Sequence, residues 1–309
     1  MITVFTATYN RANYLNTLYK SLLNQKYKNF EWLIVDDGST DGTDELIKKH
    51  ITEEKINIRY YSQENRGKYK CINKGIDLAK GDLFFIVDSD DFISNDALEK
   101  IMLWVQQLKK EDNFKDFIGV AGLKVNYNNN NMIVGTTHKF NYLDATTLEY
   151  RYKYKIKGDK AEVFFLSELK KYKFPIIDES EKFQTEAIIF NKMAQDGKKI
   201  RWYNDEIYYC EYLEDGLTMN SYKRRIENWN GYVYYYNQII NCEIPYIEKI
   251  RELSNYYRFG LNKYSLSKLN KSIKSNILPI ICIPLGLIYF NIDKYKKLKR
   301  GEKSWDIVH

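Results

Sequence analysis

The first third of the chain alternates short apolar runs with stretches whose apolar residues recur at helical spacing. The apolar runs predict strands over residues 2–7, 30–35, 56–61 and 83–87. The stretches between them predict helices over residues 12–25, 43–50, 68–79 and 95–109. Strands separated by helices of this length are typical of a parallel sheet covered by helices on both faces.

The pattern is less regular after residue 112. It indicates strands over residues 118–127, 160–165 and 201–211, and helices over residues 146–154 and 186–195. After Gly216 the chain turns helical, with helices over residues 224–241 and 247–259 and then a basic tail. We therefore expect one α/β domain over residues 1–220, with halves at 1–112 and 113–220, and a helical C-terminal extension over residues 221–309.

Three polar segments follow the predicted strands of the first third. They are Thr8-Tyr9-Asn10-Arg11, Asp36-Asp37 and Asp88-Ser89-Asp90-Asp91. In open parallel sheets the ligand lies beyond the carboxyl ends of the strands. These segments are therefore expected to converge on one edge of the sheet and to form a binding site there.

Composition narrows the kinds of site that the chain can carry. Hydrophobic residues make up 44% and charged residues 29%, which excludes a disordered chain. The net charge of +7 comes from Lys and Arg interleaved with acids, so we expect no nucleic-acid partner. Four widely spaced cysteines and three histidines leave carboxylates as the expected ligands of any metal. Neither GxxxxGK[ST] nor GxGxxG occurs, which disfavours a P-loop kinase and a dinucleotide dehydrogenase.

The acidic clusters suggest specific chemistry, and each has a simpler structural explanation. Asp88-Ser89-Asp90 at a strand end can hold Mg²⁺ or Mn²⁺ with one or two carboxylates, leaving positions open for phosphates. Alone, two acids in a loop are more often a solvated turn or a helix cap. Asp37 can accept a hydrogen bond from a base ring N–H, or belong to an acidic turn before the next helix.

Four motifs in order resemble those of family 2 glycosyltransferases: Thr6-Ala7-Thr8-Tyr9-Asn10-Arg11, Val35-Asp36-Asp37-Gly38-Ser39-Thr40-Asp41, Glu64-Asn65-Arg66-Gly67-Lys68 and Asp88-Ser89-Asp90-Asp91. The resemblance implies the GT-A fold, a Rossmann-like and mostly parallel sheet flanked by helices. It also implies a nucleotide-diphosphate sugar donor, inversion at the anomeric carbon, and a nucleotide-binding half (1–112) followed by an acceptor half (113–220).

The resemblance also implies roles for residues at the matching positions. Thr8, Tyr9 and Arg11 border the base and diphosphate, and Asp37 recognises the uracil or another base. Gly67 and Lys68 approach the nucleotide, and Ser89 lies in the nucleotide-sugar site. Asp88 lies near the ribose and the metal's water shell, and Asp90 is the principal ligand of Mn²⁺ or Mg²⁺.

Further candidates lie in the second half. Bacterial surface-polysaccharide members carry an acidic pair where this chain reads Thr185-Glu186, which makes Glu186 the candidate catalytic base. Only one acid of the pair is present, so Asp178, Glu179 and Glu181 compete, and Glu186 can instead be an acid favoured by a helix dipole. Asp159 is a candidate donor-sugar or acceptor contact. His138 is either an extra ligand or a hydrogen-bonded loop histidine, and residues 211–216 are a candidate acceptor wall or lid.

The resemblance implies metal-dependent transfer of a hexosyl or N-acetylhexosaminyl group from a nucleotide-diphosphate sugar, with a UDP-sugar as the expected donor. The expected acceptor is a glycan or lipid-linked glycan of a cell-surface polysaccharide such as a capsule. A sugar nucleotidyltransferase and a catalytically inactive sugar-binding module of the same fold are the alternatives. The chain opens on a strand-like run, so we expect no signal peptide and a cytoplasmic location.

The tail leaves two interpretations open. Residues 277–290 are apolar, too short to span a membrane, and flanked by lysines within residues 268–300. This segment can lie in a membrane interface at the inner face of the cell membrane, or it can be a helix packed on the catalytic domain.

Overall fold

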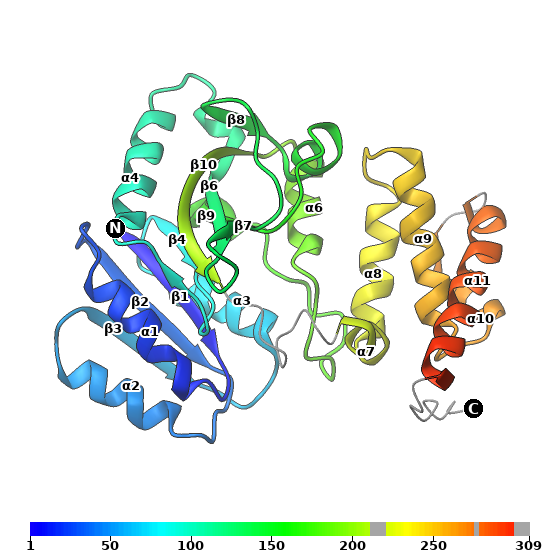
Figure 1. Cartoon of the computed structure of the whole chain (residues 1–309), viewed down its shortest axis with the longest axis horizontal. Helices are drawn as coiled ribbons and strands as arrows, with labels where there is room; N and C mark the ends of the chain where they lie inside the picture. The colour runs from blue at the N-terminus through cyan, green and yellow to red at the C-terminus, as the bar shows by residue number, and fades with distance from the viewer. Residues whose placement is uncertain (211–220, 275–277, 300–309) are drawn as a thin grey trace. The chain divides into compact units, whose positions relative to one another are not determined.

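The computed structural model describes residues 1–210, 221–274 and 278–299, which form two compact units (Figure 1). The first holds the described residues of Met1–Pro175 and Lys192–Leu213, and the second those of Ile176–Asn191 and Glu214–His309. The short segment at 176–191 thus groups with the C-terminal helices. The domain limits at residues 112 and 220 stay predictions about how the chain divides by function.

Ten strands form one sheet among the described residues of the first unit. The strand order is β3-β2-β1-β4-β9-β6-β10-β5, with β7 paired to β6 and β8 paired to β10. The strands are β1 (Ile2–Thr8), β2 (Phe30–Asp36), β3 (Asn57–Ser62), β4 (Leu83–Ile86), β5 (Phe92–Ile93), β6 (Phe117–Asn126), β7 (Met132–Ile133), β8 (Tyr142–Ala145), β9 (Lys160–Phe165) and β10 (Lys199–Cys210).

The pairing has a parallel half and a mixed half. Strands β3, β2, β1 and β4 are parallel neighbours, as the alternation of strands and helices predicts. Strand β9 runs antiparallel to both β4 and β6, and β10 runs parallel to β6. The carboxyl ends of β1, β2 and β4 therefore lie side by side at one edge of the sheet.

Helices cover both faces of this sheet. The first-unit helices that flank the parallel strands are α1 (Ala12–Leu23), α2 (Thr43–Thr52), α3 (Lys68–Leu78) and α4 (Ala97–Leu108). Ile2 and Val4 of β1 belong to the apolar cluster that includes the buried residues of α1 and α4. Phe5 points to the other face because side chains alternate along a strand, and there it meets α3 at Gly75. A Cβ at Gly75 would stand 2.2 Å from the Phe5 ring, so only glycine lets α3 pack this closely.

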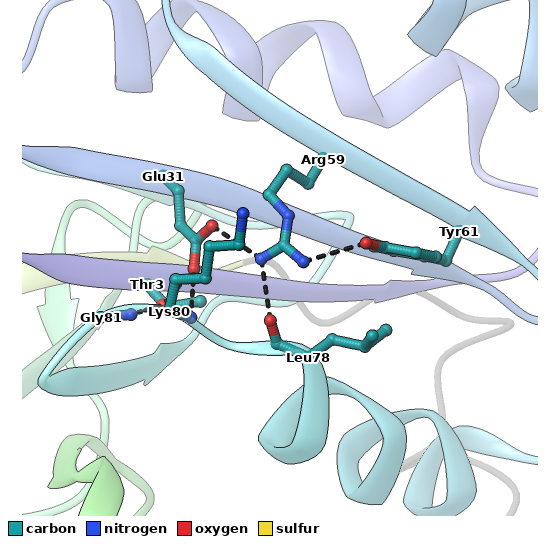
Figure 2. Close-up of polar contacts among 7 residues, drawn as sticks. All are labelled: Thr3, Glu31, Arg59, Tyr61, Leu78, Lys80 and Gly81. Carbon is teal, nitrogen blue, oxygen red and sulfur yellow. Dashed lines mark hydrogen bonds and ion pairs between the residues drawn. The ribbon is translucent and has the colours of Figure 1, made fainter.

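A buried carboxylate ties the parallel strands together (Figure 2). Glu31 of β2 is fully buried and accepts hydrogen bonds from Thr3 Oγ1 at 2.6 Å and from the backbone N–H of Lys80 at 2.7 Å. Its other oxygen accepts from Arg59 Nη1 of β3 at 2.9 Å. Arg59 also donates to the carbonyl oxygen of Leu78 at the end of α3. One carboxylate thus links β1, β2, β3 and the turn after α3.

One predicted helix differs from the structure. Residues 146–154 are helical as predicted, with a π-helix over Glu149–Lys153. The helix predicted over 224–241 is wrong as a single element, since it divides into α7 (Ser221–Glu227) and α8 (Trp229–Ile239). Asn228 separates them because its backbone is not helical and its Oδ1 accepts from the backbone N–H groups of Lys182 and Phe183.

The remaining helices complete the two units. They are α5 (Leu166–Leu169), α6 (Ala187–Gln195), α9 (Tyr246–Gly260), α10 (Leu266–Ser272) and α11 (Leu278–Lys299). In the second unit α9 packs against both α8 and α11 (Figure 1). Its core is aromatic, with Trp229, Tyr236, Tyr256 and Tyr257 buried together. In the described part of the chain, no helix combines the length and the apolar character needed to cross a membrane.

Candidate active site

The loops after β1 and β2 are joined to each other at the sheet edge. The backbone N–H of Asp37 donates to the carbonyl oxygen of Thr8 at 2.8 Å, which continues the β1–β2 ladder by one bond. The backbone N–H of Asn10 donates to Ser39 Oγ at 2.9 Å, and Asn10 Oδ1 accepts from the N–H of Thr40 at 2.8 Å. Asn10 has a φ of +52°, which asparagine tolerates better than most residues. The first two polar segments therefore form one surface.

The carboxylate of Asp37 holds the loop that precedes α3. Asp37 is buried, and its Oδ1 accepts from Gln63 Nε2 at 3.0 Å and from the backbone N–H of Arg66 at 2.9 Å. Its Oδ2 accepts from the N–H of Gly67 at 2.7 Å. Gly67 has a φ of +101°, a conformation that favours glycine. The Cys71 side chain is also hydrogen-bonded to this carboxylate. Asp37 thus fixes the backbone of residues 66–67 at the start of α3.

Lys68 links α3 to the end of β4. It is the first residue of α3, and its Nζ lies 2.7 Å from Asp88 Oδ1. The neighbouring Ser89 is buried. The third and fourth motifs of the sequence therefore meet in the first unit, beside the first two.

The loop over residues 88–91 concentrates negative charge. Burial acts to raise the pKa of Asp88, but the charges of Lys68 and Lys124 outweigh it and the pKa is lowered. Burial and then the charge of Asp88 raise the pKa of Asp90, which Arg11 and Lys68 partly offset. The same two causes raise the pKa of Asp91. Three carboxylates thus lie close enough to affect one another's pKa in a largely buried loop.

Two residues that sequence reasoning did not single out shape this loop. Tyr208 of β10 is fully buried, and its hydroxyl donates to Asp91 Oδ2 at 2.6 Å while accepting from the backbone N–H of Asp88 at 3.0 Å. Lys124 of β6 stands over the Tyr208 ring, 4.2 Å from its centroid. A lysine inside the apolar run of β6 was the one sequence feature that could have drawn attention to Lys124. Nothing local distinguishes Tyr208 among 28 tyrosines.

The first polar segment, Thr8-Tyr9-Asn10-Arg11, contains hydrogen-bond donors that differ in how far they are exposed to solvent. Thr8 is buried, and its Oγ1 has no hydrogen-bond partner among the described residues. Tyr9 is 48% exposed, and the Arg11 guanidinium lies over the Tyr14 ring, 5.5 Å from its centroid. A buried hydroxyl without a partner is costly unless a ligand satisfies it, so Thr8 is a ready hydrogen-bonding group for one.

Two site residues were predicted in the second half of the sequence, Asp159 and Glu186. They belong to segments other than the loops after β1, β2 and β4. Asp159 is exposed and comes immediately before β9, after Gly158 with a φ of +81°. Glu186 belongs to the second unit, is exposed, and directly precedes α6, where its carbonyl oxygen accepts from the N–H groups of Ile189 and Phe190. A carboxylate at this position interacts favourably with the dipole of α6. The position is equally compatible with a catalytic role for Glu186.

Two of the acids that compete with Glu186 have structural tasks. Glu181 is buried, and its carboxylate accepts from the backbone N–H groups of Asn230 at 2.7 Å and Gly231 at 2.8 Å, in the first turn of α8. Asp178 accepts from Ser180 and from Asn230 Nδ2. Glu181 therefore fixes the 176–186 segment to α8, and Asp178 assists it.

His138 and residues 211–216 are the two other candidates from the sequence. The His138 ring is hydrogen-bonded, with Nε2 at 3.1 Å from the carbonyl oxygen of Trp202, which confirms the loop-histidine interpretation. Asn204 Nδ2 also donates to the backbone carbonyl of His138 at 2.8 Å. The candidate acceptor wall at residues 211–216 lies outside the described residues.

The acidic loop fits a hard divalent cation that a ligand helps to hold. Over residues 1–210, 221–274 and 278–299 no three His, Cys, Asp or Glu side chains gather into a complete metal site. Asp88 and Asp90 supply carboxylate oxygens. Burial, and after it the charge of Asp88, raises the pKa of Asp90, and a bound cation would offset both effects. Mg²⁺ and Mn²⁺ accept one or two protein carboxylates together with phosphates and waters, so this donor set suits them.

Comparisons with known proteins bear on the same region of the chain. The model described as "Glycosyl transferase family 2" matches residues 3–172. An uncharacterized glycosyltransferase of Haemophilus influenzae is 39% identical over 107 residues, which cover 35% of this chain and 43% of that one. The putative teichuronic acid biosynthesis glycosyltransferase TuaG of Bacillus subtilis is 37% identical over 101 residues, covering 32% and 40%. The chain thus spans less than half the length of these curated relatives.

Two solved structures share the arrangement of elements. TarS of S. aureus, solved in complex with UDP-GlcNAc, has a TM-score of 0.62 at 19% identity and covers 98% of this chain and 93% of that chain. The mannosyltransferase PcManGT from Pyrobaculum calidifontis, in complex with GDP-Man and Mn²⁺, has a TM-score of 0.55 at 18% identity and covers 97% and 79%. At such identities the likeness establishes a shared fold.

Proposed function

The chain belongs to glycosyltransferase family 2 and has the GT-A fold, and on that premise we propose that it is an inverting transferase acting on a UDP-sugar. The acceptor is a hydroxyl of a glycan or lipid-linked glycan in cell-surface polysaccharide synthesis, and the transferred group is a hexose or an N-acetylhexosamine. The teichuronic acid role in the name of TuaG and the UDP-GlcNAc bound to TarS support this choice. The observation that carries the proposal is the crowded carboxylate loop at residues 88–91, beside Lys68.

The donor nucleotide is proposed to bind along the joined loops after β1 and β2. Thr8 Oγ1 is the buried hydroxyl that would bond to it, with Tyr9 and Arg11 bordering the base and diphosphate. Asp37, whose carboxylate fixes the loop before α3, is proposed to accept a hydrogen bond from the ring N–H of a uracil or another base. Gly67 and Lys68 would approach the nucleotide, and Asp159 the donor sugar or the acceptor.

Asp90 is proposed as the principal ligand of Mn²⁺ or Mg²⁺, with Asp88 and Ser89 beside it. When bound, the cation neutralises the charge that develops on the departing diphosphate. Lys68 now pairs with Asp88, and a mobile four-carbon side chain can exchange that carboxylate for a phosphate oxygen. Lys68 and Arg11 then stabilise the leaving group electrostatically.

Glu186 is proposed as the general base. A sugar hydroxyl is a weak nucleophile, so a carboxylate accepts its proton as the hydroxyl oxygen forms a bond to C1 of the donor sugar. The bond from C1 to the phosphate oxygen breaks, and the nucleoside diphosphate leaves with the electron pair. Attack from the face opposite the diphosphate inverts the configuration at C1.

The test separates the two roles by substitution. Glu186→Gln should reduce transfer by roughly 10²–10⁴-fold while UDP binding in the presence of Mn²⁺ stays at the wild-type level. Asp90→Asn should abolish the part of UDP binding that depends on Mn²⁺. Glu179→Gln and Asp112→Asn, at exposed acids, are the matched controls and should behave as wild type.

The donor is identified with a panel of UDP- and GDP-sugars, with transfer or hydrolysis measured at each. Normal transfer by the Glu186→Gln variant would reassign the base, and Mn²⁺-dependent UDP binding by Asp90→Asn would overturn the metal site. Release of pyrophosphate from UTP and a sugar-1-phosphate would show a nucleotidyltransferase instead.

We also propose that the protein works in the cytoplasm, at the inner face of the cell membrane. The surface proposed to make that contact belongs to α11 of the second unit.

A further inference from the structure

The last described helix presents an apolar stripe to solvent. Ile280 is 74% exposed and Tyr295 is 60% exposed, values far above those of a packed helix face. We define the outward face of α11 by its exposed large apolar residues within one arc of the helix: Ile280, Ile281, Leu287, Ile288, Ile292 and Tyr295. Scattered exposed apolar residues are normal on proteins, but six along one side of one helix form a continuous patch.

The opposite side of α11 is already fixed to α9. Cys282 is fully buried, and Gly286 approaches Tyr257 so closely that a Cβ there would stand 2.5 Å from the tyrosine Cβ. Arg258 of α9 binds Asp293 through two hydrogen bonds, from Nε at 2.6 Å and from Nη2 at 2.8 Å. α11 therefore packs on α9 through the side that carries Cys282, Gly286 and Asp293, and its outward face stays exposed to solvent.

The charge around this face has one sign. Between Asn262 and Arg300 the sequence holds a single acid, Asp293, which is bound to Arg258. The same stretch holds nine cations: Lys263, Lys268, Lys271, Lys274, Lys294, Lys296, Lys297, Lys299 and Arg300. Of these, Lys263, Lys268, Lys271, Lys274, Lys294 and Lys296 are exposed in the structure. The apolar stripe is thus flanked along the chain by exposed lysines, and the one acid of α11 is bound to Arg258.

We propose that the outward face of α11 binds the surface of a membrane that contains anionic lipid. The isoleucine and leucine side chains enter the boundary between headgroups and acyl chains, Tyr295 lies at headgroup level, and the lysines contact lipid phosphates. Charge favours this occupant over a second copy of the chain. In a twofold dimer the same patch meets itself, which would bring the exposed lysines of the two copies together. The proposal goes beyond sugar transfer and does not depend on it.

Vesicle co-sedimentation of the full chain tests the proposal, with phosphatidylcholine vesicles that either contain or lack a third of phosphatidylglycerol. Binding should require phosphatidylglycerol and weaken as NaCl is raised. Lys294→Gln with Lys296→Gln should weaken binding by roughly tenfold or more, since each lysine near an anionic surface contributes substantially. Lys109→Gln with Lys110→Gln, two exposed lysines of the first unit, should leave binding unchanged.

The apolar contribution is tested separately. Ile280→Ser with Ile288→Ser should weaken binding by roughly tenfold or more, because both side chains would leave the acyl boundary. Leu103→Ser, at a residue 52% exposed on α4, is the matched control. Thermal unfolding and circular dichroism of each variant check that the fold is retained.

A direct measurement does not rely on loss of binding. The four native cysteines are buried, so Ile288→Cys gives an accessible site for an environment-sensitive fluorophore. Its emission should shift to the blue on anionic vesicles and be quenched by lipids labelled in the upper acyl chain. A label at Leu103→Cys should show neither change.

Several outcomes would overturn the proposal. They are equal binding to both vesicle types, a label at position 288 that never enters lipid, and a concentration-dependent dimer that Ile280→Ser with Ile288→Ser converts to monomer. Donor turnover in solution should be the same for these α11 variants and wild type, while Asp90→Asn should still bind vesicles. Failure of membrane binding and failure of the transferase proposal are therefore distinguishable.

Discussion

Two threonines on the same face of β1 have opposite hydrogen-bonding states. Thr6 Oγ1 donates to the carbonyl oxygen of Val87 at 2.9 Å and accepts from Trp32 Nε1 at 3.0 Å. Thr8 Oγ1, two residues on, is buried without a partner in the described part of the chain. The first hydroxyl belongs to the fold, and the second is available to a ligand.

Valine at each position should separate these tasks. Thr6→Val should lower the free energy of unfolding by about 1–3 kcal/mol, because it leaves the Trp32 N–H and the Val87 carbonyl without that partner. Thr8→Val should leave stability within about 0.5 kcal/mol of wild type, yet weaken UDP affinity by about 0.5–1.5 kcal/mol. Urea unfolding and a UDP titration measure the two quantities. Equal losses of stability in both variants would contradict the assignment of Thr8.

The Tyr208 hydroxyl positions the acidic loop without touching the proposed donor. Tyr208→Phe removes a hydrogen bond to Asp91 and another from the N–H of Asp88, so we expect a stability loss of about 1–3 kcal/mol. The Mn²⁺ concentration needed for half-maximal UDP binding should also rise. Tyr203→Phe is the control, since the hydroxyl of that buried tyrosine of β10 bonds to Gln107 at 3.5 Å and to Arg201. A purely structural Tyr208 would lower stability and leave the Mn²⁺ dependence unchanged.

At the scale of elements, Glu31 makes the sheet sensitive to acid (Figure 2). Burial acts to raise the pKa of Glu31, but hydrogen bonds from Thr3, from the N–H of Lys80 and from Arg59 outweigh it, and the pKa lies below its ordinary 4.5. A folded-state pKa below the unfolded one means that the ionised group stabilises the protein above that ordinary value. This stabilisation is lost as the pH falls through the lowered folded-state pKa.

The free energy of unfolding should therefore fall below about pH 4.5. Glu31→Gln should be less stable than wild type at neutral pH, and the difference should narrow as the pH decreases, because the variant has no carboxylate to protonate. Urea unfolding at several pH values between neutral and acid measures it. Other carboxylates titrate in both proteins, so only the difference reports on Glu31. A difference that stays constant with pH would show that the Glu31 charge is not what stabilises the strands.

The sequence predicts the elements whose pattern is set by burial. Strands β1, β2 and β4 lie within one residue of their predicted limits, because strands covered on both faces are nearly continuous apolar runs. The half-exposed edge strand β3 is shifted by one residue from its prediction. Strand β5 has two residues and gives no such run. The break at Asn228 depends on the distant N–H groups of Lys182 and Phe183, which no local pattern reveals.

The candidate site is predictable from the sequence only where its residues lie in contiguous motifs. The acids and Lys68 come from contiguous motifs, and parallel strands bring their ends together. Lys124 and Tyr208 reach the loop from β6 and β10, over separations of more than thirty and more than one hundred residues. Their part in the site depends on the sheet order β9-β6-β10, which periodicity does not determine.

At the scale of the whole molecule, ligand binding should raise the free energy of unfolding. With UDP and Mn²⁺ at a hundredfold excess over Kd, wild type should gain about 2.7 kcal/mol, which thermal unfolding would show as a higher midpoint. The gain should vanish when the metal is chelated, and Asp90→Asn should show little gain under any condition. A gain that survives chelation would indicate nucleotide binding without the proposed metal.

The strand order also has a consequence for how the protein is made. Strand β6 needs β9 on one side and β10 on the other, and β10 ends at Cys210. After β6 has left the ribosome and before β10 has done so, the almost entirely buried β6 has no β10 to cover one of its edges. An uncovered apolar edge can pair with another nascent chain. Translation arrest in this interval should therefore be the step at which aggregation and chaperone demand are greatest.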